Sequence, residues 1–450
     1  MLDMTGLDIY QNHKATNLDW NGTIPKHWNV IPITKYASRV DYRGKTPNKV
    51  EEGIFLVTTK NIKDGQLDYD ISQEFIAENE YKSVMSRGYP SIGDLLFTME
   101  APLGNVAIVN KPMIAIAQRI IKFRFKSALS PKFACYSMQS VFFQSLSQKE
   151  GTGSTAIGIK ASKLSRLKLI APSLKEQAYI INFLDQKTKQ IVQAITTKEK
   201  QIALFKERKQ ILIQNAITRG LDPDAPMRDS GVDWVGQVPK HWQVKRAKYL
   251  FNEVDERSID GKEELLSVSH MTGVTPRSEK NVTMFMSEDY TGSKTCQKGD
   301  LVFNIMWTWM GALGVSDRGG IVSSSYGIFR QQQLGLFNPK YLENLLKTTG
   351  YIDHYNKVST GLHSSRLRFY GHMFFSMELG FPDRKEQDDI IDYINAEASA
   401  INKAIDIQQQ QIEKLKEYKA TLINSAVTGK IRVPGVEDIS AQAKEAECTP

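Results

Sequence analysis

One long segment of this sequence occurs twice, and that repetition restricts the chain to a duplicated architecture. Residues 172–218 align without a gap with residues 382–428, at an offset of 210 positions. About 18 of the 49 aligned positions between 172–220 and 382–430 are identical, and both copies open with the pattern Pro-x-x-x-Glu-Gln. Self-similarity at a fixed offset indicates an internal duplication, so a structure predicted for one copy is predicted for both.

Apolar residues in both copies follow spacings that alternate between four and three. This mean period of 3.5 residues predicts a long helix with one apolar stripe facing a coiled-coil partner. A helix over residues 175–217 would be about 65 Å long, and its stripe needs a partner because it would otherwise be exposed to water. The predicted seam comprises Leu184, Ile191, Ile195, Ile202, Phe205, Leu212, Ile394, Ile401, Ile405, Ile412, Leu415 and Leu422.

The heptads leave the partner of each helix open. The other copy in the same chain is the simplest partner, and a homodimer built from four such helices is the alternative. The spacing does not distinguish parallel from antiparallel packing either. A duplicated unit folded about a local two-fold axis would make the two helices antiparallel.

A second, shorter repeat precedes each globular region. Asp19–Trp28 matches Asp233–Trp242 at an offset of 214, and each copy ends in Pro-Lys-His-Trp. Tryptophan combined with proline predicts an irregular strap that is pinned by buried aromatic rings. We favour this structural role over a metal site for His27 and His241, because no cysteine or acidic residue is suitably placed near either.

Short strand signals fill the regions between the straps and the long helices. Gly53–Thr59 is apolar and β-branched, and a Gly-Asp turn leads into an apolar run at Gly93–Phe97 and again at Gly299–Phe303. Aromatic and apolar residues predict helices over 131–148 and 341–355. Each region of about 150 residues is therefore expected to form one α+β (mixed α/β) domain.

The repeats divide the chain into six predicted segments. A proline-rich linker follows the first long helix at Leu221–Pro226, and Gly429 ends the second. The segments are an N-terminal tail (1–19), a first globular domain (20–171), a first long helix (172–220), a linker with a second globular domain (221–381), a second long helix (382–430) and a C-terminal tail (431–450).

Positive charge is concentrated in the first half of the chain. The net charge is +8, with +9 over residues 20–171 and +5 over 172–220, whereas residues 382–430 carry −2. A basic surface attracts phosphates through counterion release, which favours nucleic acid as a partner without requiring it.

The sequence also indicates the cellular compartment in which the protein is expected. Its 3 cysteines stand far apart without metal-ligand spacing, which predicts a reducing compartment and neither a disulfide framework nor a zinc site. We find no run of about 18 apolar residues and no signal-peptide pattern, so a cytoplasmic protein without membrane contact is expected.

No catalytic motif is found in the sequence. Gly44-Lys45-Thr46 resembles the end of a phosphate-binding loop, but Arg39 occupies the position of that loop's first glycine. Gly-x-Ser-x-Gly, His-Glu-x-x-His and Cys-x-x-Cys are absent, as is the Asn/Asp-Pro-Pro-aromatic run of an amino-methyltransferase. We expect no catalytic residue, metal or cofactor in this chain.

Two globular regions, each followed by the same long helix opening Pro-x-x-x-Glu-Gln, resemble the specificity subunit of type I restriction-modification systems. The resemblance covers nearly the whole chain. Asp229–Trp234 leading to Pro239–Trp242, together with Gly44–Pro47 and Thr58–Ile62, also looks like recurrent sequence of that family. The second region departs from the pattern at Ser269–Met271, which prevents any transfer of individual DNA contacts.

The resemblance implies a non-catalytic DNA-binding subunit. Two target-recognition domains in a pseudo-two-fold repeat, separated by two long antiparallel coiled-coil helices, would each read one half of a bipartite site in double-stranded DNA. The helices would dock two methyltransferase subunits that use S-adenosylmethionine, and restriction (translocase-nuclease) subunits would join them. A coiled-coil scaffold without sequence-specific readout is the alternative.

Residue type and loop position suggest which side chains contact DNA. Base-edge contacts come from loop side chains set over a larger number of phosphate contacts, so polar and basic loop residues are the candidates. They are Arg43, Lys45, Thr46, Lys60, Asn61, Ser154, Thr155 and Lys160 in the first domain, and His270, Lys294, Arg330, His363, Ser364 and Arg366 in the second.

Overall fold

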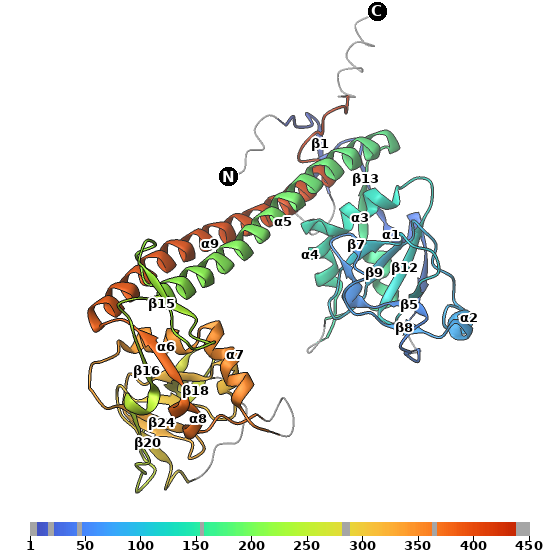
Figure 1. Ribbon diagram of the computed structural model, residues 1–450. Helices are drawn as coiled ribbons and strands as arrows, with labels where there is room; N and C mark the ends of the chain where they lie inside the picture. Colours follow the sequence, from blue (N-terminus) through green and yellow to red (C-terminus); the bar gives the residue numbers. More distant parts are fainter. Residues whose placement is uncertain are drawn as a thin grey trace, which may run out of the picture. The chain divides into compact units, whose positions relative to one another are not determined.

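The chain forms two compact units (Figure 1). The computed structural model describes residues 7–16, 22–42, 47–153, 157–280, 289–361 and 367–437. Unit 1 combines Met1–Glu199 with Gln409–Pro450, and unit 2 is Lys200–Gln408. Each unit therefore contains one globular region and one end of each long helix.

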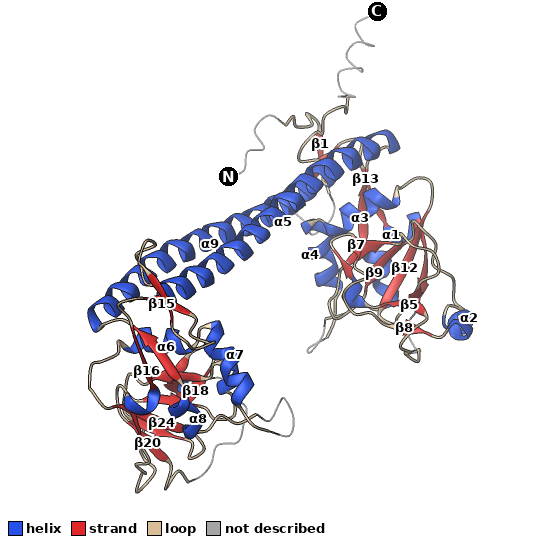
Figure 2. Cartoon of the chain, viewed as in Figure 1, coloured by secondary structure: helices blue, strands red, loops and turns tan. Residues whose placement is uncertain are grey.

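The repeated segment forms two long helices, α5 (Leu174–Arg219) and α9 (Arg384–Val427), as its 3.5-residue period predicted (Figure 2). They are 46 and 44 residues long, which corresponds to about 69 and 66 Å at 1.5 Å per residue. Among the described residues, none of the helices has the length and apolar character that a membrane span needs.

Within each unit the two long helices run antiparallel. In unit 1 the first half of α5 packs against the second half of α9, because Leu184 and Leu422 belong to one core. In unit 2 the end of α5 packs against the start of α9, where Ile217 and Ile394 share a core. The partner of each copy is therefore the other copy in the same chain, which answers the question that the heptads left open.

The apolar stripe of each helix faces its partner. Polar positions of the stripe pair as well, since Lys198 donates to the Gln411 side chain and Lys209 Nζ donates to Asn402 Oδ1 at 3.0 Å. Of the predicted seam positions, those that are buried are Leu184, Ile191, Ile394, Ile401, Ile412 and Leu422, and those that are half-buried are Ile195, Ile202, Phe205, Leu212, Ile405 and Leu415.

The globular region of unit 1 is built on an antiparallel sheet with the strand order β10-β9-β12-β4. Successive side chains of a strand point to opposite faces, so Leu95 and Phe97 of β9 enter one core and Leu96 enters another. The elements of this region are β1 (His13–Ala15), β2 (Thr23–Pro25), β3 (Asn29–Pro32), α1 (Ile33–Tyr36), β4 (Ala37–Asp41), β5 (Ile54–Val57), β6 (Ile62–Lys63), β7 (Gln66–Leu67), β8 (Phe75–Ile76), α2 (Tyr81–Val84), β9 (Leu95–Thr98), β10 (Val106–Ile108), β11 (Ala115–Ile116), β12 (Ile120–Phe125), α3 (Pro131–Gln139), α4 (Val141–Glu150) and β13 (Lys168–Ala171).

Unit 2 repeats this topology, with a sheet in the order β22-β21-β24-β17. Leu301 and Phe303 of β21 enter one core and Val302 the other, as their counterparts do in unit 1. The elements are β14 (Met227–Asp229), β15 (Gln237–Pro239), β16 (Gln243–Arg246), β17 (Phe251–Glu253), β18 (Leu266–Ser269), β19 (Gly273–Pro276), β20 (Lys294–Cys296), β21 (Leu301–Phe303), β22 (Leu313–Val315), β23 (Gly320–Val322), β24 (Gly327–Gln331), α6 (Pro339–Leu346), α7 (Thr349–Val358), α8 (Gly371–Ser376) and β25 (Glu378–Phe381).

The strap histidines and tryptophans bind the glutamate that opens each long helix. In unit 1, His27 Nε2 lies 2.8 Å from Glu176 Oε1, and the Trp28 indole donates to the same oxygen at 3.0 Å. In unit 2, His241 and Trp242 contact Glu386 at 2.8 and 3.0 Å. The strap is therefore a structural tie between the start of each globular region and its helix, as the sequence predicted.

The glutamine that follows this glutamate ties the helix to the rest of its globular region. Gln177 Oε1 accepts from the Ser130 amide at 2.8 Å, just before α3 begins. Gln387 Oε1 accepts from the Asn338 amide at 2.9 Å, just before α6 begins. The repeated Glu-Gln pair therefore has the same structural role in both units. The glutamate binds the strap, and the glutamine binds the backbone just before a helix of the globular region.

Parts of the two predicted tail segments pack against unit 1. Tyr10 is buried, and Asp8 pairs with Arg432 at 2.6 Å. Val433 and Val436 belong to the core of unit 1. Apolar and aromatic residues of these stretches therefore enter the core that also holds the start of α5 and the end of α9.

Candidate nucleic-acid interface

Three loops of unit 1 meet at the end of the sheet where β9 finishes. Thr59 Oγ1 donates to the Ala101 carbonyl at 3.2 Å, and the Ile159 amide donates to the Met99 carbonyl at 2.9 Å. A bridge between Glu100 and Gly158 adds a further link. We define the loop face of unit 1 as residues 58–61, 99–104, 152–153 and 157–158.

Unit 2 assembles the corresponding loops in the same way. The Phe369 amide donates to the Ile305 carbonyl at 3.1 Å, and Asn304 Nδ2 donates to the Val268 carbonyl at 3.3 Å. Thr360 bridges to Arg368, as Thr152 does to Gly158 in unit 1. The loop face of unit 2 is defined as residues 269–272, 304–311, 360–361 and 367–369.

Some of the candidate DNA contacts lie on or beside these faces. Lys60 is exposed on the loop face of unit 1, and exposed Lys160 follows it two residues after Gly158. His270 is exposed on the loop face of unit 2. The candidates outside the described residues are Arg43, Lys45, Thr46, Ser154, Thr155, His363, Ser364 and Arg366.

Asn61 requires a correction, because its side chain is used inside the protein. It is fully buried, and its Oδ1 accepts from the Thr58 amide and hydroxyl, both at 2.8 Å. Its Nδ2 donates to the carbonyls of Asp68, at 2.9 Å, and Ile71. A buried amide with these partners shapes the loop and leaves no group for a base, so Asn61 is a positioning residue.

Lys294 is also a structural residue rather than a DNA contact. Its side chain is only 11% exposed, its Nζ donates to the Tyr326 carbonyl at 3.0 Å, and Asp255 lies 3.6 Å away. The strand β20 that carries it pairs with β23, which turns the ammonium group inward.

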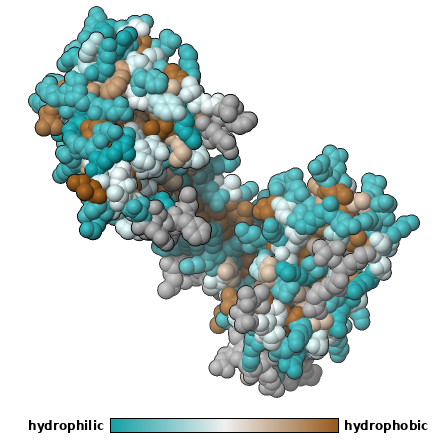
Figure 3. Space-filling model, turned by 90° about the horizontal axis from the view of Figure 1, so that it is seen from below, coloured by the Kyte–Doolittle hydropathy of each residue, from teal (hydrophilic) through white to brown (hydrophobic). Residues whose placement is uncertain are grey.

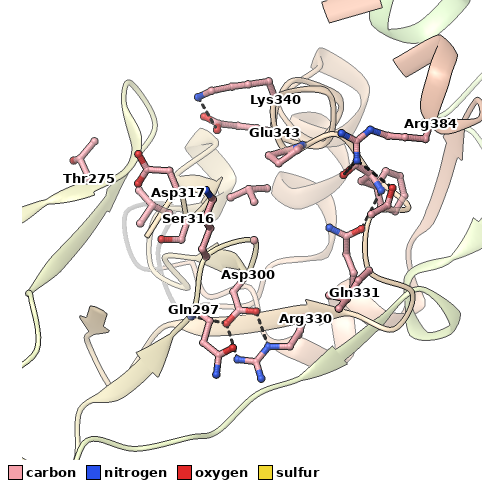
Figure 4. A pocket seen from close by; sticks show the side chains of 18 of the residues that line it. Thr275, Gln297, Asp300, Ser316, Asp317, Arg330, Gln331, Lys340, Glu343 and Arg384 are labelled. Atoms are coloured by element: carbon pink, nitrogen blue, oxygen red, sulfur yellow. Dashed lines mark hydrogen bonds and ion pairs between the residues drawn. The ribbon is translucent and has the colours of Figure 1, made fainter. Parts of the chain in front are cut away.

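Arg330 is the third correction, since all its nitrogens are engaged. It binds Asp300 with two hydrogen bonds of 2.8 and 2.9 Å (Figure 4). It also donates to Glu256 at 2.9 Å. These acidic partners, with the hydrogen bond to Asp300 first, raise its pKa. Asp300 precedes β21, so this pair lies at the opposite end of the strand from the loop face.

The same arginine–aspartate pair occurs in unit 1. Arg124 binds both oxygens of Asp94 at 2.7 and 2.8 Å, and Asp94 accepts from the Ser91 amide at 2.8 Å. Burial opposes ionisation of Asp94, but the hydrogen bonds, led by that from Arg124, lower its pKa. Both Gly-Asp turns therefore hold a buried carboxylate that is neutralised by an arginine of the neighbouring strand in the sheet, β12 or β24.

The largest cavity that we describe lies in unit 2 beside the Asp300–Arg330 pair. Its volume is about 710 Å³, and charged residues of both signs line it. Lys340 pairs with Glu343 at 3.6 Å across its rim (Figure 4). Thr272 of the loop face also lines this cavity, but the Asp300–Arg330 and Lys340–Glu343 pairs are satisfied within the domain, so the cavity contributes no argument about DNA.

Sequence reasoning missed the large apolar side chains on the loop face of unit 2. Trp307 is 44% exposed, Met310 42% and Met271 81%. The Trp-x-Trp pattern at Trp307–Trp309 could have indicated an exposed aromatic group. It was not used because apolar residues between a strand and a glycine are normally assigned to the core. Much of the molecular surface seen in Figure 3 is hydrophilic, with separate hydrophobic patches.

The family model and the sequence relatives that match this chain all describe type I restriction specificity domains or subunits. Residues 35–204 match the family described as the type I restriction modification DNA specificity domain. The chain is 22% identical over 454 residues to the type I restriction enzyme MjaVIII specificity subunit of Methanocaldococcus jannaschii, covering 94% of this chain and 98% of that protein. It is 25% identical over 237 residues to the MjaIX specificity subunit of the same organism, covering 50% and 52%.

Two solved structures share the fold. The HsdS subunit from Thermoanaerobacter tengcongensis aligns with a TM-score of 0.52 and 14% identity, covering 91% of this chain and 98% of that one. A chain from a structural study of complex assembly and conformational transition of the type I R-M system aligns with a TM-score of 0.61 and 14% identity, covering 91% and 99%. The predicted fold class is thereby confirmed.

Proposed function

The chain belongs to the family of type I restriction-modification specificity subunits, and on this premise we propose that each unit reads one half of a bipartite DNA target. The observation that carries the proposal is the duplicated loop face. Each face is built from three loops at the corresponding end of its own sheet. The strap that precedes each globular region is tied to α5 or α9 through a His-Trp-Glu contact.

Recognition of a split site needs two readers and a spacer. Readers that contact one face of B-DNA are expected about one helical turn, roughly 34 Å, apart, with unread base pairs between them. A helix pair is a suitable spacer, because hydrogen bonding fixes the rise of an α-helix at about 1.5 Å per residue. In this proposal α5 and α9 set the length of the unread gap.

The chain itself is proposed to be non-catalytic. Two methyltransferase subunits, which would carry S-adenosylmethionine, dock on the helix pair, and restriction subunits join the assembly in the cytoplasm. Lys60, Lys160 and His270 are the described candidates that remain for contact with double-stranded DNA. Lysine side chains in such positions bind phosphates and set affinity, whereas base edges set specificity.

Selection from a random-sequence duplex pool tests this function. The full chain, mixed with its methyltransferase partner at moderate salt, is expected to enrich two short motifs separated by a fixed number of unread base pairs. Methylation of the enriched duplex, compared with a scrambled duplex of the same length, provides the matched readout. Failure to enrich any motif would contradict the proposal and favour a scaffold without sequence readout.

A further inference from the structure

The loop between β21 and β22 holds an exposed tryptophan in a fixed position. Asn304, at its start, is buried and donates to the Val268 carbonyl and to Tyr326. The Trp307 amide donates to the Asn304 carbonyl at 2.9 Å, and the Ala312 amide returns to the Trp307 carbonyl at 3.1 Å. The loop backbone is therefore closed on itself around Trp307.

The neighbouring side chains support this presentation. Trp309 is half-buried, its indole donates to the Met306 carbonyl at 3.0 Å, and its ring lies 5.8 Å from that of Trp307. Thr308 is fully buried and donates to the Asn304 carbonyl at 2.8 Å. Asn304, Thr308 and Trp309 thus anchor the loop, whereas Trp307 is exposed. Within the described part of the chain, its indole nitrogen has no hydrogen-bond partner.

An exposed indole that is held in one position is uncommon on a protein surface, because contact of its apolar ring with water is unfavourable. Tryptophan is highly buried on average, and exposed aromatic residues mark binding surfaces. Met310 is exposed on the same short turn, and Met271 on an adjoining loop of the same face. Half-exposed Arg368 belongs to the same loop face and adds a positive charge to it.

The equivalent position in unit 1 is different. The loops that follow β9 and β21 each end at a glycine with positive φ, Gly104 and Gly311. Counted from the strands, Ala101 occupies the position of Trp307. The two faces share their backbone links, so the tryptophan is an addition to one reader.

We propose that Trp307, supported by Met310, is a specificity-determining residue of unit 2 that wedges against a base step of its half-site. This rests on the proposed function. An apolar wedge partly unstacks the step that it contacts, and the cost is smallest at flexible pyrimidine–purine steps. The half-site read by unit 2 therefore contains such a step, selected by its deformability.

Variants of the full chain, bound to its methyltransferase partner, test the wedge. Trp307→Ala is expected to weaken binding of the selected duplex about 10- to 100-fold, with an unchanged salt slope because no phosphate contact is lost. Trp307→Phe, which keeps an aromatic face, should stay within about threefold of wild type.

Tyr249→Ala is the matched control. Tyr249 is 64% exposed but precedes β17, whose Phe251 pairs with Gln331 at the end of the sheet opposite the loop face. Its loss should leave affinity unchanged. Selection with Trp307→Ala should relax the motif of one half-site and preserve the other.

A fluorescent base analogue locates the step. 2-Aminopurine placed in turn along the half-site should brighten at one position with wild type and at none with Trp307→Ala. Retention of both affinity and brightening in Trp307→Ala would overturn the wedge, as would loss of methyltransferase binding with DNA selection intact. If wild type itself selects no bipartite motif, the proposed function fails instead.

Discussion

Glu176 and Glu386 make the same pair of contacts, yet their surroundings differ. The side chain of Glu176 is 5% exposed and that of Glu386 is 27% exposed. Glu176 also accepts from the Ser173 hydroxyl at 2.8 Å, and the Tyr10 hydroxyl lies 3.4 Å away. Both units have the same contact between strap and helix. We expect it to stabilise unit 1 more than unit 2, because Glu176 is more buried and has more hydrogen-bond partners.

The arginine–aspartate pairs differ in a similar way. In unit 1, Lys122 lies 3.5 Å from Asp94 as a second cation, and its side chain is 5% exposed. The position equivalent to Lys122 in unit 2 is Ile328. The buried aspartate of unit 1 therefore has a second cation, Lys122, beside its arginine, whereas within the described residues the buried aspartate of unit 2 depends on Arg330 alone.

The largest effect is expected from removing the arginine in unit 2. Arg330→Ala should destabilise unit 2 by about 3–5 kcal/mol, because Asp300 is left buried and uncompensated. Arg124→Ala should cost unit 1 less, about 1–3 kcal/mol, since Lys122 remains. Thermal unfolding combined with hydrogen exchange, which resolves the two units, measures both. Asp300→Asn should rescue Arg330→Ala, and an equal loss in both units would show that Lys122 gives no compensation.

The helix tie should give the next largest difference. Glu176→Gln is expected to cost about 2–3 kcal/mol and Glu386→Gln about 1 kcal/mol, because hydrogen bonds to a charged group are worth more where water is excluded. Hydrogen exchange of the strap amides in each unit is the readout. A larger loss in unit 2 would contradict the ranking by burial.

Acid should weaken the tie in unit 1. Burial opposes ionisation of Glu176, but hydrogen bonds from His27, Trp28 and Ser173 lower its pKa from the ordinary 4.5. Its carboxylate therefore stabilises the fold above about pH 4.5, and this contribution is lost as the pH falls through the lowered value. The difference in unfolding free energy between wild type and Glu176→Gln should therefore narrow as the pH is lowered from 6 to 3. A constant difference would exclude Glu176 as the titrating group.

The smallest effect concerns phosphate contacts on the loop face of unit 1. Lys60→Ala should weaken DNA binding by about three- to tenfold and reduce the slope of log affinity against log salt by about one. Because a phosphate contact carries no sequence information, the selected motif should be unchanged. A changed motif would identify Lys60 as a base reader. Lys63→Ala, an exposed lysine outside the defined face, serves as the control.

Local repetition made the long helices and straps predictable. The 3.5-residue spacing of apolar residues such as Leu184 and Ile394 can be read from the sequence alone. A helix with such an apolar stripe needs a packing partner in any fold. The Arg330–Asp300 pair was beyond this reasoning, because it depends on β24 lying beside β21 in the sheet. Asn61 was misassigned for the same reason, since a polar residue in a loop becomes buried only when another loop folds over it.

The segments around Arg432 have a consequence for chain connectivity. At an offset of 214, Asp8 corresponds to Asp222, and at an offset of 210, Arg432 corresponds to the same residue. In unit 2 a continuous linker occupies this position, whereas in unit 1 two separate stretches of chain meet there through the Asp8–Arg432 pair. The same junction between a long helix and a strap is therefore closed by a covalent linker in unit 2 and by an ion pair between two segments in unit 1.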